Sequence, residues 1–566
     1  MSRPSAYLAL SGCLVFLSGV LVWHQWMGTS QDSDEASPPQ QTESQPGRTA
    51  IHPREVERSS DSPMWGGTPS RNLVSPVRDL PVDFLPGSLN QETGEINRAS
   101  SHNLRWVTDL GRVAAIGGAP PPAIANGRVY IGTNNLALRD PKNVGDRGVL
   151  LCLDEQTGEF VWQLVVPKFP SRVAADWEYS GIQSTPAVEG KRLWVMTNRC
   201  EILCLDVNGL QDGNDGPFVE EDKYMTTEWM KKEGVGPDFN RPYADIIWKV
   251  DLRHELGVFF HSIARGSPLV WGNHLFLTTS NGVDWSHTNI PYPNAPAMVV
   301  MDKNSGKVLG DEYSGVSGRT LHANWSSPSM GSVKGEPVVF FGGGDGYVYG
   351  FDPIPVPAED DPEFPVLREL WRCDANPPEY RTEGGVPDGE PIKYASFRSA
   401  SEVIGSPVFD NDLVYVAIGQ DAEHGDGVGM FSCIHAGFDD AKVDRAKWTY
   451  KDIGRSMSTA SVANGLVFIA ELNGDLHCLD AETGKVHWVH STDELIMGST
   501  LVADGKVHLG TESGELFIFE ASSEKSLLTT IKFPNPIYTT PVAANGTLYV
   551  RTDSHLYAFE NSSEAQ

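Results

Sequence analysis

Short runs of alternating apolar and polar residues, separated by turn residues, recur along most of the chain. In the clearest copy, Ser458 to Trp488, the apolar stretch GLVFIA is followed by the turn Asn473-Gly474 and the alternating stretch DLHCLD. Period-two alternation with turn residues between the runs predicts β-hairpins. A polar turn, AETGK, and a last run ending in Trp488 complete a unit of about four strands.

Degraded copies of this unit begin at eight positions, and the last three begin 40 and 41 residues apart, which is typical of one β-propeller blade. Longer spacings of 64, 82 and 79 residues between earlier copies indicate insertions into a constant frame. We therefore expect an all-β, eight-bladed β-propeller, with seven blades as the alternative if one weak copy is an insertion. The copies begin at Pro122, Pro186, Pro268, Pro328, Pro407, Ala460, Thr500 and Pro541.

The last copy ends at Phe559 after roughly three strands and lacks an outer strand with a tryptophan. A spare strand of that kind, NLRWVTDL from Asn103 to Leu110, stands before the first copy. Pairing the two would close the ring and leave no open sheet edge. We expect residues 103–110 to supply the outermost strand of the last blade.

Several motifs carry a family resemblance, among them TGEFVW, TGKVHW, STPAVEGKRLWV, GSPVFDNDLVYVAIG and TTPVAANGTLYV. As a set they resemble the pyrroloquinoline-quinone (PQQ) repeat family over residues 104 to 559. MWGGTPSRN and SGRTLHANWSSPS are similar to exported PQQ-repeat proteins of planctomycete type. The more distant resemblance is to quinoprotein alcohol dehydrogenases and to the outer-membrane assembly scaffold lipoprotein. The resemblance implies the propeller fold, but a fold does not by itself define a function.

The resemblance also implies roles for particular residues. Its enzymes hold PQQ and calcium with a Glu, an Asn and an Asp, and cap the quinone with two adjacent cysteines. This chain has no Cys-Cys pair and no matching carboxylate trio, so we assign no cofactor-binding residue and expect no cofactor, with PQQ or calcium as alternatives. The tryptophans that end outer strands are expected to dock between blades: Trp106, Trp162, Trp248, Trp371, Trp448 and Trp488.

The N-terminus carries an uncharged run, Ala6 to Trp23, long enough as a helix to span ~27 Å. Arg3 precedes it and an acidic stretch follows, which favours a cytoplasmic N-terminus and a propeller outside the cytoplasm. A lipobox at Leu10–Cys13 is the alternative and would make a lipoprotein. The expected division is a signal anchor or signal peptide (1–27), a disordered linker (28–63), an extended lead-in (64–102), the propeller (103–560) and a tail (561–566).

The formal charge of −30 argues against nucleic acid as a partner. We expect a monomer that contacts the membrane through its N-terminal helix and other envelope proteins through a loop face built by the insertions within 186–268 and 328–407. No activated nucleophile or phosphate loop stands out. The prediction is an exported, membrane-tethered interaction or assembly scaffold without catalytic activity. The alternatives are an oxidoreductase that uses the central pore and a calcium-dependent surface-binding module.

Two polar loops could hold a metal ion, or could be ordinary hydrogen-bonded acidic loops. One of them, DVNGLQDGNDG, resembles a calcium loop but has Leu210 at the fifth position and lacks the bidentate glutamate. The candidate ligands are Asp421, Glu423, His424 and Asp426 in GQDAEHGDG, and Asp206, Asn208, Asp212, Asn214 and Asp215 in DVNGLQDGNDG.

Histidines give a weaker signal. In HELGVFFH, His254 and His261 are seven residues apart, which does not fit the H-E-x-x-H motif of a zinc protease. Arg319, His322 and Trp325 in SGRTLHANW are expected to form a cluster at the surface or in the central pore, where ligand contact is the alternative to a structural role.

Overall fold

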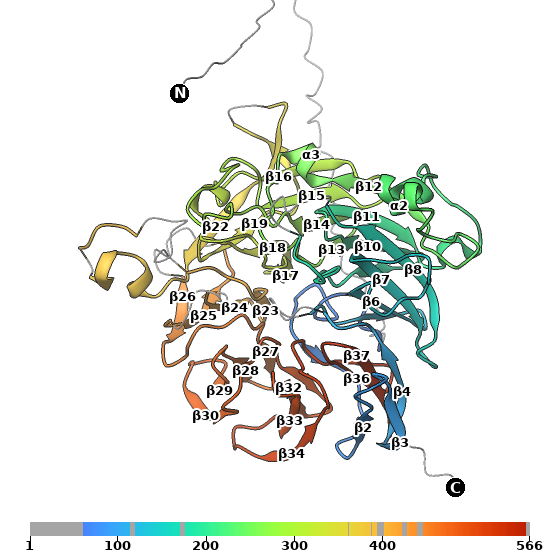
Figure 1. The fold of residues 1–566 in the computed structure, drawn as a ribbon. Coiled ribbons are helices and arrows are strands. Elements are labelled where there is room, and N and C mark those ends of the chain that lie inside the picture. The colour runs from blue at the N-terminus through green and yellow to red at the C-terminus, as the bar shows by residue number, and fades with distance from the viewer. Residues whose placement is uncertain are drawn as a thin grey trace, which may run out of the picture. The chain divides into compact units, whose positions relative to one another are not determined.

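Eight antiparallel sheets surround a common axis in the computed structural model (Figure 1). It describes residues 60–113, 119–169, 176–359, 362–386, 388–392, 401–420, 427–438 and 445–561. Each sheet has a core of four strands, with its first strand near the axis and its fourth at the periphery. The prediction of an all-β propeller with eight blades is confirmed, and the seven-bladed alternative is wrong.

The first four blades contain most of the extra segments. Their strands, from the axis outward, are β5 (Ala123–Ala125), β6 (Arg128–Asn134), β7 (Arg147–Asp154) and β8 (Phe160–Pro167) in blade 1; β9 (Ala187–Glu189), β10 (Arg192–Met196), β11 (Glu201–Asp206) and β12 (Ile246–Asp251) in blade 2; β13 (Leu269–Trp271), β14 (His274–Thr278), β15 (Met298–Asp302) and β16 (Val308–Glu312) in blade 3; and β17 (Ser329–Val333), β18 (Glu336–Gly342), β19 (Tyr347–Phe351) and β22 (Glu369–Asp374) in blade 4.

The other four blades are more regular. Their strands are β23 (Val408–Asp410), β24 (Leu413–Ile418), β25 (Met430–His435) and β26 (Ala446–Tyr450) in blade 5; β27 (Ser461–Ala463), β28 (Leu466–Ala470), β29 (Asp475–Asp480) and β30 (Val486–Ser491) in blade 6; β31 (Leu501–Ala503), β32 (Lys506–Gly510), β33 (Glu515–Glu520) and β34 (Leu527–Lys532) in blade 7; and β35 (Val542–Ala544), β36 (Thr547–Arg551), β37 (His555–Phe559) and β4 (Leu104–Asp109) in blade 8.

Outside these blade frames lie β1 (Val74–Ser75), β2 (Leu85–Leu89), β3 (Ile96–His102), β20 (Val356–Pro357) and β21 (Pro365–Leu367). The helices are short: α1 (Glu221–Met225), α2 (Glu228–Glu233), α3 (Leu252–Leu256), and the 3-10 turns η1 (Gly209–Gln211), η2 (Ser317–Arg319), η3 (Pro378–Tyr380) and η4 (Glu383–Gly385). Each of the eight predicted starting positions immediately precedes the innermost strand of a blade.

The ring closes through the N-terminal strand, as the sequence predicts. β4 pairs antiparallel with β37, with Asp109 opposite His555 and Trp106 opposite Ala558. Blade 8 therefore takes three strands from the C-terminal end of the chain and one from the N-terminal side. Closure leaves neither strand with an open edge at this seam.

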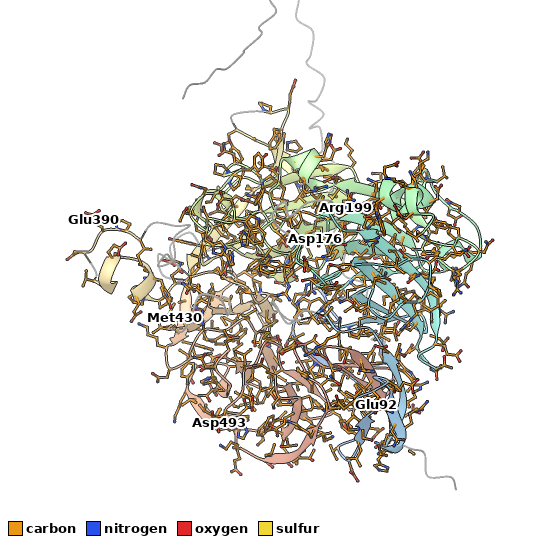
Figure 2. All side chains as sticks on the ribbon, viewed as in Figure 1. Glu92, Asp176, Arg199, Glu390, Met430 and Asp493 are labelled. Carbon is orange, nitrogen blue, oxygen red and sulfur yellow. The ribbon has the colours of Figure 1, made fainter. Side chains whose placement is uncertain are left out.

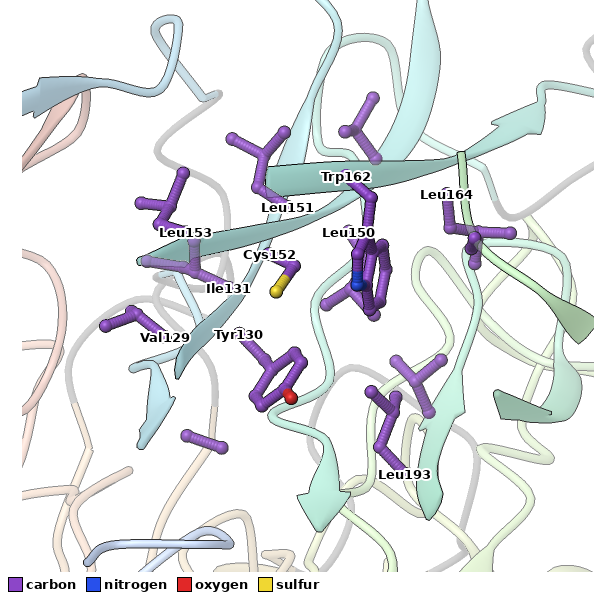
Figure 3. Packing of buried hydrophobic residues seen from close by; sticks show 14 of the residues in the cluster. Val129, Tyr130, Ile131, Leu150, Leu151, Cys152, Leu153, Trp162, Leu164 and Leu193 are labelled. Atoms are coloured by element: carbon purple, nitrogen blue, oxygen red, sulfur yellow. The ribbon is translucent and has the colours of Figure 1, made fainter. Parts of the chain in front are cut away.

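Tryptophans lie between adjacent blades, and their rings leave no room for a side chain at the glycine of the Thr-Gly turns. Figure 3 shows Trp162 beside Tyr130, Leu150 and Leu193 at the junction of blades 1 and 2. A Cβ at Gly158 or Gly484 would lie 2.5 Å from the ring of Trp106 or Trp448 of the preceding blade. Indole N–H groups also donate to carbonyls of the next blade, in the pairs Trp106–Glu155, Trp162–Val207, Trp371–Ala436, Trp448–Ala481 and Trp488–Ser522. Trp248 packs over Gly306 in the same manner.

Two of the insertions that were expected to contribute to a loop face also cover outer strands. Residues 207–245 run beside β8 of blade 1, where Tyr243 bridges Gln163. In the insertion after β19, strand β21 pairs with β16 of blade 3. Both segments supply hydrogen bonds to a blade edge that would otherwise be open. The segment that holds η3 and η4 leads outward instead, and Figure 2 shows its Glu390 beyond the rim of the ring.

The lead-in segment, residues 60–75, crosses one end of the propeller and contacts all eight blades near their innermost strands. Arg71, fully buried, donates to the carbonyls of Trp65, Ser267, Pro268 and Pro328. Contacts to the remaining blades join Ser62 to Ile124, Pro63 to Val188, Ser70 to Phe409, Asn72 to Val462, Leu73 to Val502 and Ser75 to Ala543. The segment therefore seals this end of the central channel.

The expected anchor helix at Ala6–Trp23 lies outside the residues that the structure describes. Within the described ranges, no helix has the length and apolar character needed to span a bilayer. Residues Met1–Glu57 and Arg58–Gln566 form separate units.

Candidate functional site

The two ends of the propeller differ in what they carry. In an antiparallel four-stranded blade, the connection between the second and third strands emerges at the same end as the connection to the next blade. We call this end the upper face. The lower face, where the first strand turns into the second, is the end sealed by residues 60–75.

A small polar cavity of about 110 Å³ occupies the channel. Its walls carry hydroxyls from the residues just before the innermost strands, and these link one blade to the next. The backbone N–H of Thr185 donates to Ser267 Oγ at 3.1 Å, and that of Ser267 donates to Ser327 Oγ at 2.9 Å. The same contact joins Ser406 to Thr459, Thr459 to Ser499 and Ser499 to Thr540.

Arg265 also lines this cavity, together with Trp65, Trp325 and Tyr538. Burial lowers the pKa of Arg265 to about 10, so its guanidinium stays charged at neutral pH. The cavity is smaller than the ~300–1,000 Å³ typical of small-molecule sites. In the described state it is suited to water or a small anion.

Three histidines converge on the upper face beside the channel. We call His261, His287 and His322 the histidine cluster. Their ring centroids lie 4.2 Å apart for His261 and His322, 4.9 Å for His261 and His287, and 4.8 Å for His287 and His322. His261 and His322 are 2 % exposed and His287 is half-buried. One potential ligand atom from each ring lies within 4.8 Å of the other two.

The cluster is assembled from three connections of the upper face. His261 precedes blade 3, His287 lies between β14 and β15 of that blade, and His322 precedes blade 4. Backbone pairing brings them together: the N–H of Val283 donates to the carbonyl of His322 at 2.8 Å, and Gly282 bridges Ala323. A Cβ at Gly282 would lie 2.3 Å from the His322 carbonyl oxygen, so this approach requires a glycine.

Hydrogen bonds orient two of the imidazole-bearing segments. Nδ1 of His261 lies 2.6 Å from the carbonyl oxygen of Val283, which can only accept, so Nδ1 carries the proton. The N–H of His287 donates to the carbonyl of Asp284, and His287 itself has a left-handed backbone with φ of 55°. The loop is thus a folded turn that presents His287 toward the other two rings.

Aromatic rings surround the cluster. Trp325 is buried and its ring lies 4.9 Å from that of His322, while Trp285 lies 5.8 Å from His261. Trp177, from the connection between blades 1 and 2, contacts Trp285 edge to face at 5.7 Å. Because Trp325 also lines the channel, the cluster and the channel share a wall.

A second group of potential ligands, Glu471, Asp475 and His477, lies in blade 6. Both ring nitrogens of His477 have protein partners. Nε2 lies 3.3 Å from the Glu471 carboxylate, and Nδ1 lies 3.2 Å from the Tyr450 hydroxyl. Glu471 also accepts from the N–H of Gly454. These contacts join blades 5 and 6 and account for the group as part of the packing between them.

The acidic loops behave differently from the histidine cluster. Asp421, Glu423, His424 and Asp426 lie outside the described residues. In the other loop Asp206 pairs with Arg192, Asn208 donates to Asp212, and Asn214 donates to Glu221. The N–H of Asp215 donates to Asp245. Calcium binding by either loop stays a prediction.

The sequence indicated only part of the histidine cluster. Arg319, His322 and Trp325 were expected together at the surface or in the pore. The rings of His322 and Trp325 lie 4.9 Å apart and Trp325 lines the channel, whereas the guanidinium of Arg319 pairs with the buried Asp345 at 3.0 Å. His261 appeared only in a motif that fails the zinc-protease pattern, and His287 had no motif. The missing signal is positional, because all three occupy upper-face connections of neighbouring blades.

Comparison with known proteins agrees with the repeat type. The family profile described as "Outer membrane protein assembly factor BamB" matches residues 88–215, 381–490 and 436–523. The resemblance to the PQQ-repeat family is therefore confirmed. The fold is an eight-bladed propeller, and the matched segments are similar to this repeat family.

Solved structures with a similar fold include BamB from Moraxella catarrhalis, at 12% identity over 81% of this chain and 99% of that chain, with a TM-score of 0.45. Quinohemoprotein alcohol dehydrogenase from Comamonas testosteroni is 13% identical over 90% of this chain and 82% of that chain, with a TM-score of 0.44. No curated protein matches the chain. At these identities the similarities do not distinguish a scaffold from an enzyme.

Proposed function

We propose that this protein is an exported, membrane-tethered scaffold that binds another envelope protein through the upper face of blades 1 to 4 and has no catalytic activity of its own. One observation carries the proposal. Large apolar side chains are exposed on the upper connections of blades 1 and 3 and on the connections that follow them: Leu136, Leu138, Tyr179, Trp285, Tyr292 and Tyr313, each 41–66 % exposed.

Exposed aromatic side chains gathered on one face favour protein binding, because they supply apolar contact area at a low cost in side-chain entropy. The described upper connections of blades 6 to 8 expose no comparable side chain. The formal charge of −30 disfavours nucleic acid and supports a partner with a neutral or basic contact surface. The matching family description and the apolar run Ala6–Trp23 support an envelope location.

Photo-crosslinking tests the surface directly. A photoreactive amino acid at Tyr313, which is 66 % exposed on the upper face, should give one dominant crosslinked protein in intact membranes. The same probe at Trp229, 54 % exposed on the insertion that covers blade 1, is the matched control and should give none of that product. Equal products at the two positions, or none at Tyr313, would contradict the proposal.

The location has its own test. Protease added to spheroplasts should digest the propeller and leave a small membrane-embedded fragment, because the positive-inside bias places the propeller outside the cytoplasm. Protection of the full-length chain in intact spheroplasts would refute this orientation. Lipid attached to Cys13 would favour the lipoprotein alternative.

A quinone-dependent oxidoreductase is the rival function. The small polar channel and the lack of a Cys-Cys pair support the scaffold instead. Purified protein mixed with PQQ and calcium should show neither dye-linked alcohol oxidation nor stabilisation. A ligand at 100 times its Kd would stabilise the fold by ~2.7 kcal/mol, so a clear upward shift in Tm would overturn the proposal.

A further inference from the structure

We propose that the histidine cluster binds one divalent transition-metal ion, such as zinc, through imidazole nitrogens of His261, His287 and His322. This inference is independent of the scaffold function, which requires no metal. Imidazole is a good ligand for zinc and copper, and three histidines with a fourth, open position form a known zinc coordination set. Calcium and magnesium prefer oxygen ligands and should not compete for this site.

The spacing of the nitrogens fits a single ion. Because the three candidate atoms lie within 4.8 Å of one another, some point is no more than about 2.8 Å from all three. A zinc–nitrogen bond measures about 2.0–2.1 Å. Each ligand atom therefore has to move by less than about 1 Å, which small rotations about the side-chain torsions of three histidines provide.

The hydrogen bonding of His261 prepares it as a ligand. Its Nδ1–H donates to the Val283 carbonyl, which leaves the lone pair on Nε2 for a metal. A hydrogen bond of this kind fixes the tautomer and the ring direction at metal sites. The N–H of the same Val283 donates to the carbonyl of His322, so one peptide segment holds both histidines in place. The site is preorganised by backbone contacts.

The surroundings suit a cation with one accessible position. The Asp284 carboxylate, which accepts hydrogen bonds from the Ser286 N–H and the Asn289 amide, contributes negative charge beside the cluster. Trp325 closes the inner side as a buried ring. On the outer side His287 is half-buried and Trp285 is 51 % exposed. A fourth ligand, water or a group from a bound partner, would enter from the upper face.

Metal titration of the full-length protein tests this. Metal-free protein is titrated with Zn²⁺ and, separately, with Co²⁺, in an excess of Mg²⁺ and Ca²⁺ that occupies weak carboxylate sites on the acidic surface. We expect one tightly bound ion per chain and a Co²⁺ absorption spectrum typical of four-coordinate nitrogen ligation. X-ray absorption of the zinc-loaded wild type should show three imidazoles, a readout that needs no variant.

Substitution identifies the ligands. His287→Ala, in a partly exposed loop, should weaken Zn²⁺ binding about 100-fold or more while the metal-free Tm stays unchanged. The matched control is His254→Ala, because the His254 side chain is 85 % exposed on α3, seven residues before His261, and its loss should not affect binding. No bound ion, an ion that His287→Ala does not weaken, or equal losses in both variants would overturn the proposal.

Discussion

Blades 6 to 8 and blades 1 to 4 share one frame but differ in their connections. We call them the regular arc and the inserted arc. In the regular arc the second and third strands of blades 6, 7 and 8 are joined by residues 471–474, 511–514 and 552–554, which are short turns that bond to connections beside them, as the N–H of Glu512 does to the carbonyl of Leu495. In blade 3 the corresponding connection spans 279–297 and contains Trp285, His287 and Tyr292. The difference shows that the sheets supply rigidity while long connections supply chemistry.

The largest test of this comparison removes the elements that hold both arcs in one ring. A chain that starts at residue 60 should melt like the full-length protein, because residues 1–57 form a separate unit. A chain that starts at residue 96 loses the contacts of the lead-in and should melt several degrees lower. A chain that starts at residue 111 also loses β4, leaves β37 as an open edge and should not unfold cooperatively. Equal melting temperatures for the last two chains, measured by circular dichroism, would contradict closure by β4.

Arg71 tests how strongly the lead-in ties down the inserted arc. Arg71→Met removes four hydrogen bonds to carbonyls, three of which precede blades 3 and 4. Burial lowers the pKa of Arg71 to about 9, so the lost interactions are those of a charged group at neutral pH. We expect the free energy of unfolding to fall by about 3 kcal/mol or more. Arg78→Met, at an exposed position seven residues further along the chain, should change it by less than about 0.5 kcal/mol in denaturant titrations.

The regular arc can be tested at its glycines. Gly484→Ala places a methyl group 2.5 Å from the ring of Trp448 at a φ of 71°. Gly465→Ala meets a similar φ of 76° but has no atom within 4 Å of the new Cβ. Backbone strain should cost each variant about 1–2 kcal/mol, and the clash should cost Gly484→Ala a further 1–3 kcal/mol or so. Equal losses in the free energy of unfolding, measured by chemical denaturation, would show that Trp448 does not clash with a methyl group at this turn.

Much of this architecture could be predicted, because each blade repeats the same local code. The Gly and Asn turns, the period-two runs and the terminal tryptophans located all eight innermost strands and the closing strand. Local patterns could not show where residues 207–245 run, since their path depends on a contact between Tyr243 and Gln163 of another blade. The histidine cluster was missed for the same reason. His261, His287 and His322 are far apart in sequence and meet only in the folded ring, where upper-face connections of neighbouring blades lie side by side.

The inserted arc also contains a buried acid, Glu312, whose contribution to stability depends on pH. Glu312 in β16 accepts from the N–H groups of Ala297 and Ser314, but burial raises its pKa to about 8, with Asp311 and Asp345 acting in the same direction. The folded protein therefore keeps a proton that the unfolded chain releases near pH 4.5. Its stabilising contribution is complete below that pH and is lost as the pH rises toward 8, by up to about 5 kcal/mol.

Glu312→Gln removes this titration. The Tm of the wild type should fall relative to that of the variant between pH 5 and pH 9, whatever the fixed cost of the substitution. Parallel Tm profiles would show that Glu312 does not bind a proton in the folded state. The regular arc offers the control, because Glu520→Gln changes an exposed carboxylate at the end of β33 and should give a profile parallel to that of the wild type.

The central claim is that the inserted arc binds a partner through its upper face, and quantitative co-purification tests it most directly. Full-length wild type, Trp285→Ala/Tyr313→Ala and Leu527→Ala/Leu528→Ala are isolated from membranes and their bound proteins are compared by mass spectrometry. The second pair is exposed on β34 of the regular arc, at 41–46 %. We predict that the upper-face pair reduces recovery of the major partner by about tenfold or more, as expected for aromatic side chains at the centre of an interface, while the control pair leaves it unchanged. Unchanged recovery with Trp285→Ala/Tyr313→Ala, or an equal loss with the control pair, would contradict the account.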